Sequence, residues 1–206
     1  MENFKSIKQK VVTAETVINK SRFLAFACGV SDAAQANSFI AGIAKKHYAA
    51  THNCYAYRLT DGQKFSDDGE PQGTAGMPIL ECIKSKGLTN VVVVVTRYFG
   101  GVKLGAGGLV RAYTEATAAA LDLAEKTEFK LCVKVEFTAD YRQTNLLNSL
   151  LDKRARKVET AYEGDVKFNV LIEKSMYAQF EADFTELTQG QIELVLNGEV
   201  LEECEI

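Results

Sequence analysis

Glycine is concentrated in one part of this chain. Ten of its 15 glycines lie between Gly62 and Gly108, and both prolines fall in the same interval. Glycine loses more chain entropy on folding than any other residue, and it is kept where φ is positive or where another group approaches the backbone closely. Two stretches, 67–76 and 97–108, therefore have a closely specified backbone shape. Their charged and aromatic side chains are the first place to look for function.

The first 128 residues have the pattern of a mixed α/β domain. Residues 90–96 form an apolar, β-branched run, which is typical of a central strand that is covered on both faces. Ser31-Asp32 begins a helix that ends near Tyr48, and Pro78 suits the first turn of another. The remaining expected elements are strands at 10–17, 22–30 and 53–59, a loop at 60–76, and a long Ala-rich helix at 109–125.

The last 78 residues have a simpler pattern. A strand at 131–139 precedes a helix that Asp140 caps and that runs through Arg154. Strands at 155–162 and 166–174 follow, then a helix that Ser175 caps, and a last strand at 191–196. The order β-α-β-β-α-β predicts a ferredoxin-like domain. We therefore expect an α+β protein of two domains, 1–128 and 129–206, with the boundary within 126–129.

Charge divides along the same boundary. Through Glu128 there are 15 Lys and Arg against 12 Asp and Glu, a balance of +3, and from Phe129 onward 9 against 15, a balance of −6; the two give the net charge of −3. The first domain can accept an anionic partner, whereas the second is a poor generic phosphate binder.

The chain shows no targeting or membrane signal. Residues 1–10 lack an apolar segment, and the longest apolar run, 91–95, is too short to span a bilayer. Five scattered cysteines without a C-x-x-C pair are typical of reduced thiols in the cytosol. These features predict a cytoplasmic protein with no membrane partner and no expected cofactor.

The second glycine-rich stretch lies between a buried strand and a helix. Such a junction presents backbone N–H groups and the positive end of a helix dipole, so it could hold an anion. The alternative is that the glycines only permit tight packing, and the sequence matches neither the P-loop nor the dinucleotide fingerprint. The candidates for an anion or RNA site are Arg97, Tyr98, Phe99, Gly100, Gly101, Lys103, Gly105 and Arg111.

The first stretch is acidic. Asp67, Asp68 and Glu70 could hold a divalent cation, although EF-hand spacing is absent. Asp-Gly followed by Pro is also good turn chemistry, and the turn could pair with Arg97. We expect the two stretches to meet in space and form one cleft on the first domain.

A Cys–His pair precedes both stretches. His52 and Cys54 are two residues apart on an expected strand, so they share a face. They could be a nucleophile and its base, or a cysteine that is simply a small core residue. No orienting carboxylate stands at a readable spacing, which favours the core residue.

Several of these segments together resemble the Impact/YigZ family. The resemblance rests on Thr51-His52-Asn53-Cys54, on residues 67–76, and above all on the long run from Gly87 to Gly105. It implies a first domain like the second domain of the fifth small-subunit ribosomal protein, and a second like the last domain of elongation factor G. Eukaryotic Impact members regulate a kinase that responds to uncharged tRNA through an added N-terminal module, and the resemblance does not extend to that module.

Three functions follow as hypotheses. The leading one, which the resemblance implies, is a protein that binds RNA or the ribosome and is linked to regulation of translation. The second is an enzyme or nucleotide-binding protein that uses the glycine-rich stretch for phosphate and the acidic stretch for metal. The third is a regulatory module for a protein partner, with Tyr98 and Phe99 as exposed anchors.

Overall fold

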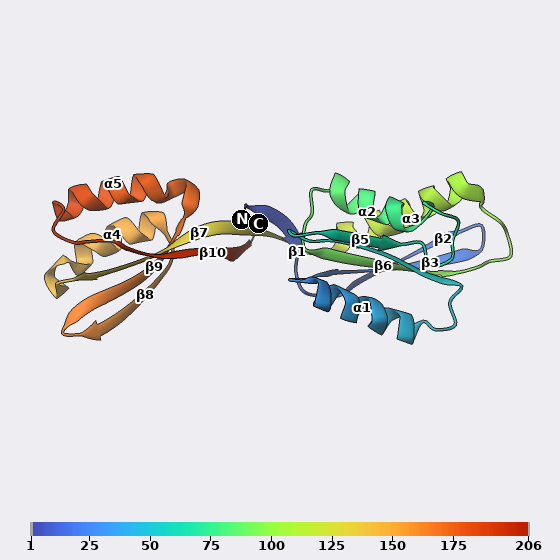
Figure 1. Cartoon of the computed structure of the whole chain (residues 1–206), viewed down its shortest axis with the longest axis horizontal. Coiled ribbons are helices and arrows are strands. Elements are labelled where there is room, and N and C mark those ends of the chain that lie inside the picture. The colour runs from blue at the N-terminus through green and yellow to red at the C-terminus, as the bar shows by residue number, and fades with distance from the viewer. Residues whose placement is uncertain (1, 206) are drawn as a thin grey trace. The chain divides into compact units, whose positions relative to one another are not determined.

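A computed structural model describes residues 2–205. The chain divides by its contacts into two compact units, which consist mainly of residues 4–128 and 129–204. The chain forms two five-stranded sheets that are combined with helices, so the α+β class with two units is as expected (Figure 1).

The first unit is built on an antiparallel sheet in the order β2-β3-β6-β4-β5. Its central strand, β6, carries the apolar run that predicted burial on both faces. Val91, Val93 and Val95 pack against α2 and α3, and Val92 packs with α1 on the opposite face. The elements are β1 (Phe4–Ile7), β2 (Val12–Ile18), β3 (Ser21–Gly29), α1 (Ala33–Lys46), β4 (His52–Arg58), β5 (Gln63–Ser66), α2 (Gly76–Ser85), β6 (Val91–Tyr98) and α3 (Gly105–Leu123).

Local sequence accounts for several of these boundaries. The β2–β3 hairpin turns at Asn19 and Lys20, whose φ angles of 47° and 67° are those of a two-residue turn that follows the strand twist. Asp32 caps α1 by accepting the N–H of Gln35 at 2.8 Å, as predicted. Pro78 lies in the first turn of α2, also as predicted.

Three expectations for the first unit were wrong or incomplete. Residues 105–108 are not loop but the first turn of α3, because glycine does not prevent a helix from starting where the chain is exposed. The expected loop at 60–76 contains β5, a short polar strand that pairs with β4. Strand β1 was not predicted at all, and it is hydrogen-bonded to β7 (Lys126–Ala139).

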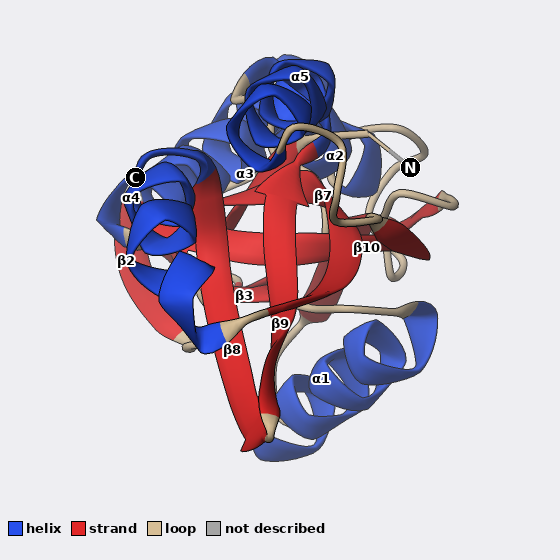
Figure 2. Cartoon of the chain, turned by 90° about the vertical axis from the view of Figure 1, so that its left-hand side faces the viewer, coloured by secondary structure: helices blue, strands red, loops and turns tan. Residues whose placement is uncertain are grey.

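The second unit has the predicted β-α-β-β-α-β order, with β7 between β9 and β10 and β8 beside β9. Alternate strand residues such as Val135, Phe137 and Phe168 form a core with α4 and α5, which cover one face of the sheet (Figure 2). The elements are β7 (Lys126–Ala139), α4 (Thr144–Arg154), β8 (Ala155–Glu163), β9 (Asp165–Glu173), α5 (Tyr177–Thr188) and β10 (Val195–Glu205), with 3₁₀ turns at Tyr141–Gln143 and Lys174–Met176.

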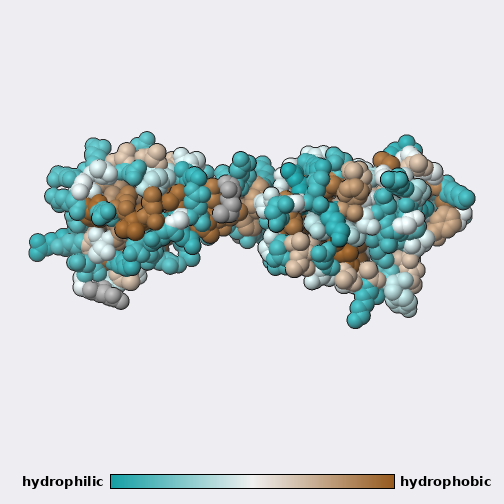
Figure 3. All heavy atoms as spheres, in the orientation of Figure 1, coloured by the Kyte–Doolittle hydropathy of each residue, from teal (hydrophilic) through white to brown (hydrophobic). Residues whose placement is uncertain are grey.

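Two details of the second unit differ from expectation. Ser175 does not cap a helix; its hydroxyl donates to Glu173 at 2.8 Å, and the 3₁₀ turn leads directly into α5. The last strand begins at Val195 rather than at residue 191 and continues to Glu205. Figure 3 shows apolar side chains gathered over the helices of this unit, where Leu146, Leu150 and Leu187 line a groove between α4 and α5.

Among residues 2–205, no helix is both long enough and apolar enough to cross a membrane.

Candidate functional site

The two glycine-containing stretches meet at an ion pair inside the first unit. Arg97, near the end of β6, donates from Nη1 to Oε1 of Glu70 at 2.6 Å. The two residues are only 5% and 8% exposed, respectively. The guanidinium carbon lies 5.5 Å from the ring centroids of both Phe23 and Phe99. The expected meeting of the stretches is confirmed at this point, and the pairing alternative for the acidic stretch is the one that the structure contains.

The ion pair belongs to a larger buried network. Tyr113 of α3 donates its hydroxyl to Oε1 of Glu70 at 2.8 Å, and Cys54 Sγ lies 3.3 Å from that hydroxyl. Sequence reasoning missed Tyr113; its signal was a large polar-tipped side chain on the apolar face of an Ala-rich helix, which needs a partner when buried. The network therefore joins β4, β6, α3 and the acidic stretch into one rigid unit.

The chemistry of this network does not favour a cysteine nucleophile. Burial raises the pKa of Cys54 to about 12, and its thiol donates to the carbonyl of Asp67 at 2.9 Å. A thiol in this state is protonated at neutral pH and unreactive. His52 lies on the same strand, but its Nδ1 is 2.6 Å from the carbonyl oxygen of Asp68, and its Nε2 is 3.8 Å from Oε2 of Glu70. Cys54 is thus a core residue, and His52 supports the acidic turn.

The acidic stretch uses its carboxylates to hold its own shape. Asp67 accepts the N–H groups of Gly73, Ala75 and Gly76 at 2.8–3.0 Å, and so ties the turn to the start of α2. Burial raises the pKa of Asp67, but these three hydrogen bonds outweigh burial and hold it below its ordinary value.

Asp68 and Glu70 point to other partners. Asp68 accepts the N–H of Asn53 at 2.6 Å, while Glu70 is engaged by Arg97. Within residues 2–205 no group of three or more His, Cys, Asp or Glu side chains is placed to hold a metal ion. The geometry thus gives the divalent-cation hypothesis for Asp67, Asp68 and Glu70 no support.

The segment between β6 and α3 is exposed but firmly anchored. Phe99 donates its N–H to Oγ1 of Thr51, and Gly100 donates its N–H to Oγ of Ser21, both at 3.1 Å. A Cβ on Gly100 would lie 2.0 Å from the carbonyl carbon of Lys20, so only glycine fits against the hairpin turn. The segment is therefore held by Ser21 at the start of β3, by Thr51 just before β4 and by the hairpin turn at Lys20.

A group of cations surrounds this segment. Lys103 is exposed just before α3, and Arg111 is exposed in the second turn of that helix. Lys20 is exposed in the hairpin turn that Gly100 contacts. Lys45 and Lys46 end α1, which reaches the same end of the sheet because His47 Nδ1 lies 2.9 Å from the Tyr98 hydroxyl. Within residues 2–205 none of these five cations forms an ion pair. We call this end of the unit, which includes Phe99, the cationic end.

The structure separates the predicted anion-site residues into two groups. Phe99, Gly101, Lys103, Gly105 and Arg111 are exposed at the cationic end, and Gly100 supports them. Arg97 is buried against Glu70, so its charge is already compensated, and the expectation that it contacts RNA is not supported. Tyr98 is half-buried with its hydroxyl bonded to His47, so it is no exposed anchor for a partner.

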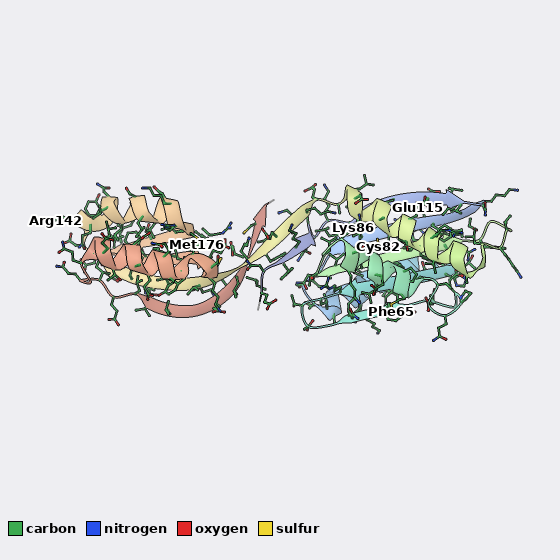
Figure 4. All side chains as sticks on the ribbon, turned by 90° about the horizontal axis from the view of Figure 1, so that it is seen from above. Phe65, Cys82, Lys86, Glu115, Arg142 and Met176 are labelled. Carbon is green, nitrogen blue, oxygen red and sulfur yellow. The ribbon has the colours of Figure 1, made fainter. Side chains whose placement is uncertain are left out.

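The face formed by α2 and α3 carries ordinary surface contacts. Lys86, which follows α2, pairs with Asp122 near the C-terminal end of α3, and Figure 4 shows Cys82, Lys86 and Glu115 on this face. Cys82 is buried, and burial raises the pKa of its thiol.

Fold and site together define an α+β protein of two units whose signature residues form a buried structural network beneath an exposed, cationic segment. The chain matches the Impact N-terminal domain over residues 19–121 and a domain of unknown function, DUF1949, over residues 137–191. It belongs to the IMPACT family.

Relatives of similar length support this assignment. The chain is 41% identical over 184 residues to the IMPACT family member YvyE of Bacillus subtilis, covering 87% of this chain and 85% of that protein. It is 32% identical to YigZ of Escherichia coli over 192 residues, or 89% and 93% of the two chains.

Two further likenesses differ in extent. Protein IMPACT of Homo sapiens is 45% identical over 65 residues, which are 30% of this chain and 20% of that protein. A solved structure described as a hypothetical protein is 29% identical, with a TM-score of 0.62 over 95% of this chain and 97% of that one.

Proposed function

We propose that the protein binds RNA, as presented by the ribosome, through the cationic end of its first unit, and that it acts in the regulation of translation. The observation that carries the proposal is a set of five exposed cations, unpaired within residues 2–205, at the same end of the unit as the anchored segment that presents Phe99. Phosphate contacts from Lys and Arg supply most of the affinity of nucleic-acid binding. The role in translation rests on the family resemblance.

The rest of the first unit is consistent with this use. Helix α3 begins without a side-chain cap and without an acidic residue in its first turn, so the dipole of its N-terminus adds to the positive potential there. The nearest cation on β3, Arg22, is neutralised by Glu15 at 2.7 Å, so we do not include it. The second unit carries the charge excess of −6 and is not expected to bind RNA.

The proposal places the protein in the cytoplasm. All five cysteines lie within the described residues and none forms a disulfide, which suits a reducing compartment. The ribosome is found in the same compartment.

A salt series tests the proposal. Filter binding with a ribosomal RNA fragment should weaken as KCl rises, with a log–log slope that falls by about 0.7 for each single-strand phosphate contact removed. The double variant Lys20→Ala, Lys103→Ala should therefore flatten the slope, whereas Lys64→Ala should not, because Lys64 is exposed on β5 away from the cationic end.

Two results would count against it. Binding that is absent, or that is indifferent to salt and to the double variant, would contradict RNA recognition at this surface. If ATP or inorganic phosphate at low millimolar concentration displaced the RNA and shifted the melting temperature by itself, the small-molecule phosphate hypothesis would be favoured instead.

A further inference from the structure

Phe99 is an exposed aromatic residue that the fold holds in place rather than hides. Its side chain is 48% exposed, while the preceding residue, Tyr98, turns inward to His47. The Thr51 hydroxyl fixes the backbone of Phe99, and the close contact of Gly100 with Lys20 fixes the next residue. An aromatic side chain on such an immobilised segment loses little conformational entropy when a ligand covers it.

One side of the Phe99 ring already has a partner. The guanidinium of Arg97 lies 5.5 Å from the ring centroid, and Arg97 is itself fixed by Glu70. A cation near a ring face interacts favourably with the aromatic quadrupole and fixes the orientation of the ring. The exposed part of the ring remains available to a flat ligand.

We propose that Phe99 is a stacking platform for an unpaired RNA base, with Lys20 and Lys103 beside it to contact the flanking phosphates. The inference rests on the proposed function and specifies its ligand as single-stranded or looped RNA. In a duplex each base face is covered by its neighbours, so an aromatic ring cannot stack on it, whereas unpaired bases stack readily on Phe, Tyr and Trp.

The sequence provides a direct probe, because the chain contains no tryptophan. In the full-length variant Phe99→Trp, the single indole should be quenched when a 12-nucleotide single-stranded RNA is added, and much less when the same strand is added as a blunt-ended duplex with its complement, which has no unpaired base. Phe99→Ala should weaken single-strand binding about 5- to 150-fold, the effect of losing one stacked base. Tyr162→Ala is the matched control, because Tyr162 is an exposed aromatic residue of the second unit, 69% exposed.

The outcomes separate the two proposals. Suppose that both RNAs bind equally, that the double variant Lys20→Ala, Lys103→Ala reduces the salt dependence, and that Phe99→Ala does not change the affinity. The RNA proposal then stands and the stacking inference is wrong. If neither RNA binds the wild-type protein, both fail. If Phe99→Ala alters the melting temperature, the variant Phe99→Leu is used instead. It keeps apolar bulk without an aromatic face and should show the same loss of affinity for single-stranded RNA.

Discussion

Nη1 of Arg97 lies 2.6 Å from Oε1 of Glu70, and both side chains are almost completely buried. The two residues come from the two glycine-containing stretches, so their pairing fixes how the acidic turn sits on the end of β6. It also accounts for two of the polar residues that accompany the glycines, because Arg97 and Glu70 bond to one another in the interior rather than face a ligand. The candidates for ligand binding are then the exposed residues of the cationic end, such as Phe99 and Lys103.

Removal of Arg97 should be severely destabilising. Arg97→Met leaves the Glu70 carboxylate buried without its counter-charge, which costs about 3–5 kcal/mol in the free energy of unfolding. Urea unfolding followed by circular dichroism measures it. The control is Arg22→Met, which removes an exposed partner of Glu15 and should change stability little. If Arg97→Met and Arg22→Met had equal effects, burial of the Arg97 pair would be unimportant for stability. Adding Glu70→Leu to Arg97→Met should recover much of the lost free energy of unfolding, because no buried charge then remains unpaired.

Asp67 should make the first unit sensitive to acid. Its pKa is lower in the folded than in the unfolded chain, so its stabilisation is complete above the unfolded pKa of about 4 and is lost as pH falls through the lower folded value. Asp67→Asn should cost about 1–3 kcal/mol at pH 7, and the difference from wild type should shrink as the pH falls below about 4. Asp61→Asn, an exposed substitution, serves as control in the same urea titrations. A gap that stays constant with pH would contradict this role.

Gly100 and Gly107 should respond oppositely to alanine. A methyl group at Gly100 would lie 2.0–2.2 Å from the Lys20 carbonyl group, so Gly100→Ala should displace the hairpin turn and cost about 1–3 kcal/mol. Gly107 has nothing within 4 Å of such a methyl group and lies in a helix, so Gly107→Ala should stabilise by up to about 1 kcal/mol. The melting temperatures of the two variants, compared with that of the wild type, test this expectation. A Gly100→Ala variant that melts higher than the wild type would show that the segment between β6 and α3 is loosely held.

Cys54 should be inert in the native protein. With a pKa of about 12, its thiolate fraction at pH 8 is on the order of 1,000-fold below that of an ordinary cysteine, and the side chain is buried. Iodoacetamide labelling read by mass spectrometry should modify half-buried Cys204 well before Cys54, and all five cysteines once the chain is unfolded in urea. Rapid labelling of Cys54 in the native state would revive the nucleophile hypothesis.

The elements that could be predicted from the sequence are those whose signal lies in neighbouring residues. The apolar run of β6 and the cap at Asp32 are encoded in neighbouring residues, and both were predicted. β5 has only one apolar residue, Phe65, and exists because Tyr55 and Ser66 pair across the sheet, which no local pattern contains.

The site shows the same limit. The glycine pattern indicates the region, and a pairing of the acidic turn with Arg97 is one of the alternatives that the sequence leaves open. Which of the charges is buried depends on a contact 27 positions apart in the chain. The exposure of Phe99 against the burial of Tyr98 depends on where His47 lies, at the end of another element. Such distinctions need the assembled fold.

The second unit should fold without the first. Its core consists of side chains from residues 129–206 alone, including Phe137, Phe168, Phe180 and Phe184, and chains of this length can be stable by themselves. We expect the fragment 129–206 to unfold cooperatively in urea. Phe180→Ala in the fragment should cost about 3–5 kcal/mol and abolish that transition, because Phe180 is fully buried between α5 and the sheet. A fragment that unfolds gradually, with no response to Phe180→Ala, would mean that this core forms only in the complete chain.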